Sequence, residues 1–322
     1  MARRKGPGKH YRKGMSIIDL TDRFPNDETA EAWFVESRWP NGIRCAHCES
    51  ENVAENGNHP TMPYHCRACR KFFSVKTNTV MHSSKVGYRK WALAIYILTT
   101  NIKGTSSMKL HRDVGVSQKT AWHMAHRIRK AWQTDAPVFA GPVESDETFV
   151  GGLESNKHAD KKLNAGRGPV GKAAVVGVKD RATNKVSAAP VEATDARTLQ
   201  GFVLDRTEAA ATVYTDEARA YDGLPRLRQA VKHSIGEYVD GQAHTQGIES
   251  FWAMLKRGYQ GTYHKLSEKH LARYIAEFEG RHNQRPLDTI EQMSAIARGM
   301  DGKRLRYEDL IGPAETRQPR MI

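Results

Sequence analysis

The chain has 322 residues, more than one hydrophobic core usually spans, so two or three domains are expected. It carries 50 Lys and Arg against 36 Asp and Glu, a formal net charge of +14, and this excess favours a polyanionic partner such as a nucleic acid. No stretch approaches the roughly 18 apolar residues that span a bilayer, and no apolar run follows the basic start. We therefore expect no membrane partner and no secretory leader, and a soluble, intracellular protein.

The chain opens with a basic arm, residues 1–14. The segment NDETAEAWFVESRW at 26–39 follows, with apolar residues at helical spacing. We expect a short helix there, capped by Asn26 or Asp27.

All four cysteines fall within 25 residues in the spacing C-x2-C-x17-C-x2-C, as Cys45, Cys48, Cys66 and Cys69. Two knuckles that each carry a thiolate pair can form a tetrahedral site for a structural Zn²⁺, with no open position for a water molecule. Two disulfides, four unrelated core cysteines and an iron–sulfur site are the alternatives. Since zinc ribbons bind DNA, RNA or protein, the quartet predicts a module and leaves its partner open.

The segment 88–132 has apolar residues at three- and four-residue steps, interrupted near Gly104 and Gly115, and predicts helices joined by tight turns. Within it, SSMKLHRDVGVSQKTAWHMAHRIR fits a helix-turn-helix whose second helix is capped by Ser117. A small helical linker with a solvated basic face is the alternative. The second helix is expected to present four side chains outward to DNA phosphates or base edges, namely Gln118, Lys119, His123 and Arg127.

Beyond Pro137 the pattern changes to extended runs. PVESDETFVGG, AAVVGVKD and KVSAAPVEA predict three strands, a helix is expected at 196–209, and ATVYTDEA predicts a fourth strand. This order indicates a mixed α/β (α+β) domain. The last third is expected to contain three helices, which Thr245, Ser267 and Pro286 open.

Three acidic residues stand at the ends or edges of these elements. Asp146 lies in VESDETFVGG, Asp216 ends TVYTD, and Glu249 lies in the first turns of the helix TQGIESFWAMLKRG. Hard divalent cations prefer carboxylate oxygens, and two Mg²⁺ (or Mn²⁺) ions about 4 Å apart stabilise the entering and leaving oxygens of phosphodiester cleavage. Lys256 follows Glu249 by two helical turns, so both share a face and the ammonium can reach a DNA phosphate. Solvated surface charges are the alternative for each acid.

Neighbouring residues leave further alternatives open. Glu144 shares the strand face of Asp146 and either assists the metal or, as we expect, remains a surface charge. His244 either contacts substrate or caps the helix that follows. The Lys-rich loop 154–172 either clamps DNA or is a disordered solvated loop.

Four stretches together resemble bacterial DDE insertion-sequence transposases of the ISXO-like group with an N-terminal zinc ribbon. They are CAHC with YHCRACRKFFSVKTNTVMHSSK, ESDETFVGG, VYTDEARAY and HTQGIESFWAMLKRGYQGTYHKLSEKHLARYIAEF, and they run from about residue 22 to about residue 285. The resemblance implies that Asp146, Asp216 and Glu249 match the DDE metal ligands and that Lys256 matches the basic residue after the Glu. It also implies an RNase H-like fold, terminal inverted repeats as the recognised DNA, and a multimeric synaptic complex.

Two departures from the family pattern stand close to these acids. Ser145 occupies a position where an apolar strand residue is expected, and Gln246 with Gly247 replaces an expected polar pair before Ile248. Neither departure removes a metal ligand.

The sequence therefore predicts a Mg²⁺-dependent DNA transposase that binds terminal inverted repeats, hydrolyses the DNA strand and joins the 3′-OH to target DNA. Duplex DNA is the expected partner, contacted also by Lys256 and Arg257, and the chain is expected to form a homo-oligomer in a cytoplasmic, nucleoid-associated setting. The alternatives are a nuclease or resolvase on the same fold, a catalytically silent DNA-binding regulator, and an RNA-processing zinc-ribbon protein. The expected divisions are a basic arm and short helix (1–38), a zinc ribbon (39–82), a helix-turn-helix-like DNA-binding segment (83–135), an RNase H-like catalytic domain (136–300) and a charged tail (301–322).

Overall fold

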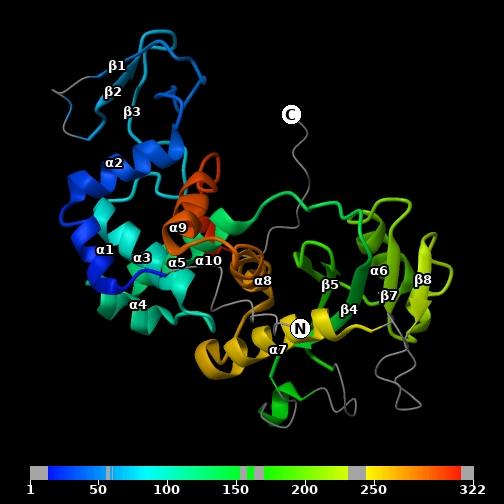
Figure 1. Cartoon of the computed structure of the whole chain (residues 1–322). Helices are drawn as coiled ribbons and strands as arrows, with labels where there is room; N and C mark the ends of the chain where they lie inside the picture. Colours follow the sequence, from blue (N-terminus) through cyan, green and yellow to red (C-terminus); the bar gives the residue numbers. More distant parts are fainter. Residues whose placement is uncertain are drawn as a thin grey trace, which may run out of the picture. The chain divides into compact units, whose positions relative to one another are not determined.

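The computed structural model describes residues 14–55, 59, 61–152, 158–162, 170–230 and 244–312. They form two compact units (Figure 1). The first unit holds the described residues up to Asn101, with Thr105–Gln133 and those from Arg285 onward, and the second holds Ile102–Gly104 and those of Thr134–Gln284. Most of the Lys-rich loop at 154–172 lies outside the described residues. In the part of the chain that is described, no helix has the length and apolar character needed to cross a membrane.

Two short helices begin the first unit, α1 at Ile17–Arg23 and α2 at Asp27–Arg38. The side chain of Asn26 accepts the backbone N–H of Thr29, which confirms the predicted cap of α2. Trp33 is buried on the inner face of this helix. The helical spacing of the sequence thus gives a helix with one apolar side.

A small antiparallel sheet follows, with β1 at Val53–Glu55, β2 at Tyr64–Cys66 and β3 at Phe72–Phe73 (Figure 1). Phe73 is fully buried and packs against Tyr64, with 5.4 Å between the ring centroids. The hairpin between β2 and β3 carries one cysteine pair, and the segment before β1 carries the other.

Three helices form the centre of the first unit, α3 at Tyr88–Thr100, α4 at Ser107–Val114 and α5 at Gln118–Trp132. Gly115 ends α4 with φ of +67°, a left-handed conformation that glycine adopts at little cost. Ser117 then caps α5 through its side-chain oxygen. The predicted helix-turn-helix geometry is therefore confirmed.

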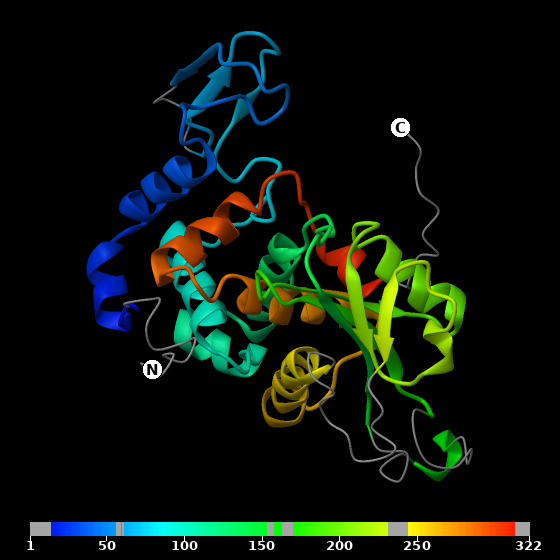
Figure 2. The same ribbon diagram turned by 45° about the vertical axis from the view of Figure 1, so that its right-hand side comes forward.

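Two further helices, α9 at Thr289–Arg298 and α10 at Tyr307–Ile311, complete the first unit. Helix α9 packs against α2, α3 and α5 (Figure 2). The prediction that Pro286 opens this helix is wrong, because Asp288 and Glu291 form a capping box that sets the helix start at Thr289. The division drawn from the sequence grouped α9 with the α/β domain, whereas its packing partners belong to the first unit.

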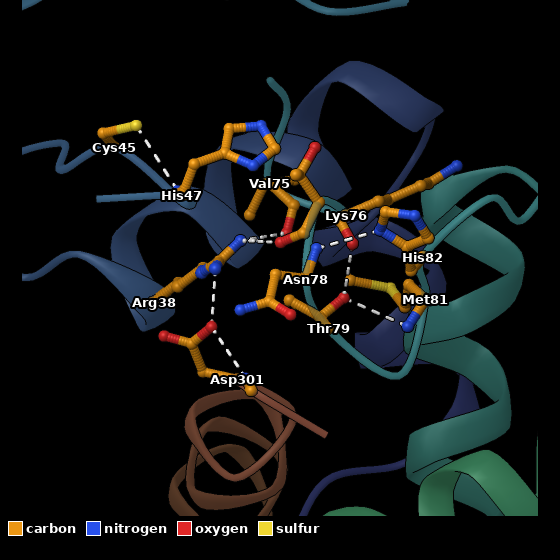
Figure 3. A network of polar contacts seen from close by, with 12 residues as sticks. Arg38, Cys45, His47, Val75, Lys76, Asn78, Thr79, Met81, His82 and Asp301 are labelled. Atoms are coloured by element: carbon orange, nitrogen blue, oxygen red, sulfur yellow. Dashed lines mark hydrogen bonds and ion pairs between the residues drawn. The ribbon is translucent and has the colours of Figure 1, made fainter. Parts of the chain in front are cut away.

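Arg38 connects α2 to the segment after the small sheet and to the residues after α9 (Figure 3). Its guanidinium donates to the carbonyls of Val75 at 2.9 Å and Thr77 at 2.8 Å, and it pairs with Asp301 at 2.5 Å. Thr79 forms an isolated β-bridge with Asp301. These contacts hold three separate segments of the first unit together.

The second unit is built on a mixed sheet of five strands. They are β4 at Val143–Val150, β5 at Ala173–Asp180, β6 at Val186–Val191, β7 at Thr212–Thr215 and β8 at Leu227–Ala230, in the spatial order β6-β5-β4-β7-β8. Strands β4, β5 and β6 pair antiparallel, whereas β7 is parallel to both β4 and β8. The first four strands match the predicted runs, and β8 was not predicted from the sequence.

Helices cover both faces of this sheet: α6 at Ala196–Leu204 on one face, and α7 at Gln246–Gly258 with α8 at Glu268–Asn283 on the other. Successive side chains of β5 point to opposite faces of the sheet. Val176 packs with the hydrophobic residues of α6, and Val175 packs with those of α7 and α8. A mixed five-stranded sheet with helices on both faces is the RNase H-like fold expected for this domain.

The starts of α7 and α8 and three short helical turns are the remaining described features of the second unit. Thr245 and Ser267 occupy the cap positions of α7 and α8, as predicted. A π-helical turn, η5 at Tyr259–Tyr263, follows α7, and two 3₁₀ turns lie at Ala159–Lys161 (η2) and Arg219–Tyr221 (η3). Helix α7 thus begins where the sequence indicated, at Gln246, so that Glu249 falls in its first turn.

Candidate active site and zinc centre

Strand β4 places polar side chains on both faces of the sheet. Glu144 and Asp146 lie on the face that α7 covers, since Glu144 bonds to the backbone of that helix. Ser145 and Glu147 lie on the opposite face, where the Tyr221 hydroxyl donates to Glu147 Oε2 at 3.0 Å and the Ser145 hydroxyl donates to Tyr221 at 3.4 Å. The serine at this otherwise apolar position is thus hydrogen-bonded within the core.

The Asp146 carboxyl is half-buried, and its pKa is raised to about 7. Burial is the main cause, and the negative charges of Glu147, Asp216 and Glu249 raise this pKa further. Asp216 and Glu249 therefore both lie within electrostatic reach of Asp146.

Asp216 directly follows β7, the parallel neighbour of β4. Glu144 and Tyr214 are paired across the two strands, so Asp146 and Asp216 each lie two residues beyond that pair. Arg228 donates to the backbone carbonyl of Asp216 at 3.0 Å and fixes the loop that carries it. Parallel pairing thus brings these two acids to the same end of the sheet.

Glu249 lies exposed in the first turn of α7. The Thr245 hydroxyl donates to its Oε1 at 2.9 Å and orients the carboxylate. Lys256 and Arg257 are also exposed, near the C-terminal end of the same helix. Helix α7 therefore carries an acid at one end and two cations at the other.

The donor set of the three acids fits hard divalent cations. Carboxylate oxygens are the preferred ligands of Mg²⁺ and Mn²⁺, and a bound cation would relieve the repulsion that, after burial, raises the pKa of Asp146. Among the described residues, only the cysteine quartet brings three or more ligand atoms within 4.8 Å of one another. Asp146, Asp216 and Glu249 do not form such a group among the described residues.

Two neighbours of the acids differ from their predicted roles, and a third was not predicted. The expectation that Glu144 is a surface charge is wrong: it is 1% exposed and pairs with Arg181 at 2.9 Å. His244 lies next to Glu144, and Thr245, not His244, holds the cap position of α7. Glu147 was not singled out from the sequence, although alternation along VESDETFV would have placed it on the face opposite Asp146.

The cysteine quartet forms a compact centre in the small sheet. Sγ of Cys45 lies 3.6 Å from Sγ of Cys69, and Sγ of Cys48 lies 3.7 Å from Sγ of Cys66. Tetrahedral zinc with Zn–S bonds of about 2.3 Å places its sulfurs about 3.8 Å apart, whereas a disulfide requires about 2.0 Å. The arrangement fits Zn²⁺ and excludes the disulfide alternative.

Backbone groups around the quartet favour thiolates. The N–H of His47 points to Cys45 Sγ at 3.4 Å, and the N–H of Cys69 points to Cys66 Sγ at 3.5 Å. The Cys69 N–H is the main cause that lowers the pKa of the Cys66 thiol to about 7, whereas burial raises the pKa of the Cys45 and Cys69 thiols. Such N–H···S bonds within each knuckle are consistent with ligation by sulfur anions.

Helix α5 presents only part of its predicted DNA-facing surface. Gln118 and Lys119 are exposed at its start. His123 and Arg127 are half-buried, contrary to expectation, and both contact the carbonyl of Leu305, at 3.2 and 3.1 Å. The segment between α9 and α10 covers this part of the helix, a contact that local sequence cannot indicate.

Comparisons with known proteins agree with this architecture. Residues 138–283 match the family described as the ISXO2-like transposase domain, and residues 25–72 match the transposase zinc-ribbon domain. The chain is also similar to an uncharacterized protein in transposable element ISH50 of Halobacterium salinarum, with 32% identity over 272 residues, which cover 80% of this chain and 91% of that protein. With its zinc-ribbon centre, RNase H-like sheet and matched domains, the chain belongs to the family of ISXO2-like transposases.

Proposed function

We propose that this chain is a DNA transposase that binds the terminal inverted repeats of its own element, hydrolyses the DNA strand at each end and joins the freed 3′-OH to target DNA. The observation that carries the proposal is the parallel pairing of β4 and β7, which places Asp146 and Asp216 at the same end of the sheet, with the charges of Asp216 and Glu249 within electrostatic reach of Asp146. Membership of the transposase family supports the same reading.

The three acids would hold two Mg²⁺ or Mn²⁺ ions. When bound, such ions stabilise negative charge on both the entering and leaving oxygens of a phosphodiester. In the first reaction a water oxygen attacks phosphorus at the element end while the 3′ oxygen leaves. In the second, the 3′-OH attacks a target phosphodiester, and the new P–O bond forms as the target strand breaks. The ammonium of Lys256 would hold a DNA phosphate beside the reacting group.

DNA recognition is assigned to the first unit and to the end of α7. Carboxylates that bind metal beside the phosphodiester contact the DNA backbone, so sequence choice must come from other side chains. Gln118 and Lys119 are exposed at the start of α5, the part of a recognition helix that reaches base edges in helix-turn-helix proteins. Lys256 and Arg257 would contact phosphates, and a homo-oligomer would bring two element ends together.

The testing experiment is a strand-transfer assay with a labelled duplex carrying the terminal repeat, a target plasmid and Mg²⁺. It compares the parent protein with Glu249→Gln and with Glu268→Gln as a matched control, since Glu268 is an exposed acid in the first turn of α8. We expect joined product from the parent and from Glu268→Gln, and a loss of at least about a thousandfold for Glu249→Gln, as expected when a metal ligand is removed.

Three results would overturn the proposal in different ways. Cleavage without joining indicates a nuclease or resolvase. Repeat binding with neither reaction indicates a silent DNA-binding regulator. Full activity of Glu249→Gln would contradict the assignment of Glu249 to the metal site.

A further inference from the structure

The side chain at the cap position of α7 does not accept a backbone N–H from the first turn of that helix. A helix cap usually accepts the backbone N–H of the second or third helical residue. Thr245 occupies the cap position but makes no such bond, because its hydroxyl donates to Glu249. The N–H of Ile248, the third helical residue, instead donates to Glu144 Oε2 at 2.9 Å.

Glu144 reaches this position from strand β4, two residues before Asp146 and on the same face of the sheet. Its other oxygen, Oε1, accepts Arg181 Nε at 2.9 Å and lies 3.4 Å from Nδ1 of His244. Both carboxylate oxygens are therefore engaged, and a carboxylate at a helix N-terminus is also favoured by the helix dipole. Glu144 is thus hydrogen-bonded to α7 through one oxygen and paired with Arg181 through the other.

Arg181, the residue directly after β5, contacts Glu144 and two neighbouring segments. Besides Glu144, it donates from Nη2 to the backbone carbonyl of His244 at 2.5 Å, and its guanidinium lies 3.9 Å from the ring centroid of Tyr214. Arg181 therefore joins β7, the residue before Thr245 and Glu144 through one planar group.

Gly247 completes the contact. A Cβ at this position would lie 2.6 Å from Glu144 Oε2 and 2.9 Å from Lys179 Nζ, closer than real Cβ atoms come to their neighbours. Lys179 Nζ also donates to the Gly247 carbonyl at 3.2 Å. The glycine that departs from the expected polar pair is thus the residue that lets Glu144 reach the helix.

We infer that Glu144 and Arg181 are positioning residues, which fix the first turn of α7 against β4 so that Glu249 faces Asp146. This inference rests on the proposed function, since it assigns the two residues to the same metal site. In this inference both residues act through Glu249 and not by binding the metal or the DNA themselves. Loss of the Glu144 carboxylate lets the first turn of α7 move relative to Asp146, which weakens cation binding more than it weakens DNA binding.

The experiment compares the parent full-length protein with Glu144→Ala, Glu144→Gln and Glu279→Gln. Glu279 is the matched control, because it is another carboxylate of the second unit, half-buried, that accepts a strand N–H, that of Ala188 at 3.1 Å. Three quantities are measured well below the melting temperature: the Mg²⁺ concentration for half-maximal cleavage, the Mn²⁺ affinity by electron paramagnetic resonance, and the terminal-repeat affinity in Ca²⁺.

For Glu144→Ala we expect the half-maximal Mg²⁺ concentration and the Mn²⁺ dissociation constant each to rise by about tenfold or more, with terminal-repeat affinity within about twofold of the parent. Glu144→Gln is expected to recover part of this loss, because its amide oxygen can still accept the Ile248 N–H. Glu279→Gln should match the parent. A lower melting temperature with unchanged cation dependence would reduce Glu144 to a structural residue and overturn the inference.

Arg181→Lys provides a second route if Glu144→Ala does not fold. It keeps the positive charge beside Glu144 but loses the fork that joins Glu144 to His244, so we expect a smaller shift in cation dependence in the same direction. Parent-like cation dependence in Arg181→Lys and Glu144→Gln together would overturn the inference. If the parent itself neither cleaves nor joins DNA, the proposed function fails, whereas the Mn²⁺ affinities still test the positioning role.

Discussion

Asp146 on β4 lies directly opposite Gly177 on β5, and the glycine leaves room for the ring of Trp252 from α7. A Cβ at position 177 would lie 2.8 Å from two ring atoms of Trp252 and 3.1 Å from Ile248 Cδ1. The missing side chain thus sets how closely the helix that carries Glu249 approaches the strand that carries Asp146.

Gly177→Ala is expected to destabilise the second unit by about 1–3 kcal/mol, the usual cost of adding a methyl group to a packed interior. It should also slow Mg²⁺-dependent cleavage, because α7 must move away from the sheet. Urea unfolding and the cleavage assay measure the two effects. The control is Gly201→Ala in α6, where nothing lies within 4 Å of an added Cβ. Equal stability of the two variants would contradict the packing argument.

The zinc centre predicts a local loss on ligand removal. Cys66→Ser should abolish zinc binding and unfold the small sheet, since a closed sulfur site contributes folding energy directly. Metal analysis after dialysis and limited proteolysis around residues 45–72 check this. His65→Ala, a change in the same strand, should keep its zinc; retention of zinc by Cys66→Ser would argue against the quartet as the site.

The start and the middle of α5 should respond differently to mutation. Lys119→Ala is expected to weaken terminal-repeat binding, by roughly 1 kcal/mol for one lost phosphate contact and more if Lys119 reads a base, with little change in melting temperature. Arg127→Ala should mainly lower the melting temperature, because Arg127 donates to the Leu305 carbonyl. Parallel measurements of DNA affinity and thermal unfolding distinguish the two, and equal effects on both quantities would contradict the division.

Arg38 should be a strong stability determinant of the first unit. Its side chain is 5% exposed and joins Asp301 to two backbone carbonyls (Figure 3), so Arg38→Ala leaves buried acceptors unpaired and is expected to cost about 2–4 kcal/mol. The comparison is Arg44→Ala, whose ion pair with Glu51 is exposed and worth about 0–1 kcal/mol. Chemical unfolding measures both, and a cost for Arg38→Ala no larger than that for Arg44→Ala would refute the role.

Glu279 gives the second unit a defined pH dependence. Burial raises its pKa from 4.5 to about 7, so the folded unit binds a proton that the unfolded chain has already lost between these values. The parent should therefore lose stability as the pH rises from about 4.5 to about 7. Relative to the parent, Glu279→Gln should be more stable by about 2–3 kcal/mol at pH 8 and no more stable near pH 4. Urea unfolding across this range checks the sign, and a gain that does not change with pH would contradict it.

Several features followed from the sequence because they depend on local chemistry. The cysteine spacing identified the zinc centre, the turn at Gly115 and the cap at Ser117 identified the helix pair, and alternation in β4 placed Glu144 and Asp146 on one face of the strand. Each of these rests on residues within one short stretch of the chain, at most 25 residues long. The family resemblance then singled out three acids that composition alone could not separate from the other 33 of the 36 Asp and Glu residues.

Other features depend on which segments meet in space, and only the tertiary structure decided them. From the sequence, Glu144 is expected to be a surface charge at the end of a strand. In the structure it accepts the backbone N–H of Ile248 in α7, 104 residues later in the chain. From the sequence, the side chain of His123 is expected to face solvent. In the structure the segment around Leu305 covers it. Local periodicity fixes which face of a helix or strand a side chain occupies, whereas burial and hydrogen-bond partners are set by the element that packs on that face, and that element lies far away along the chain.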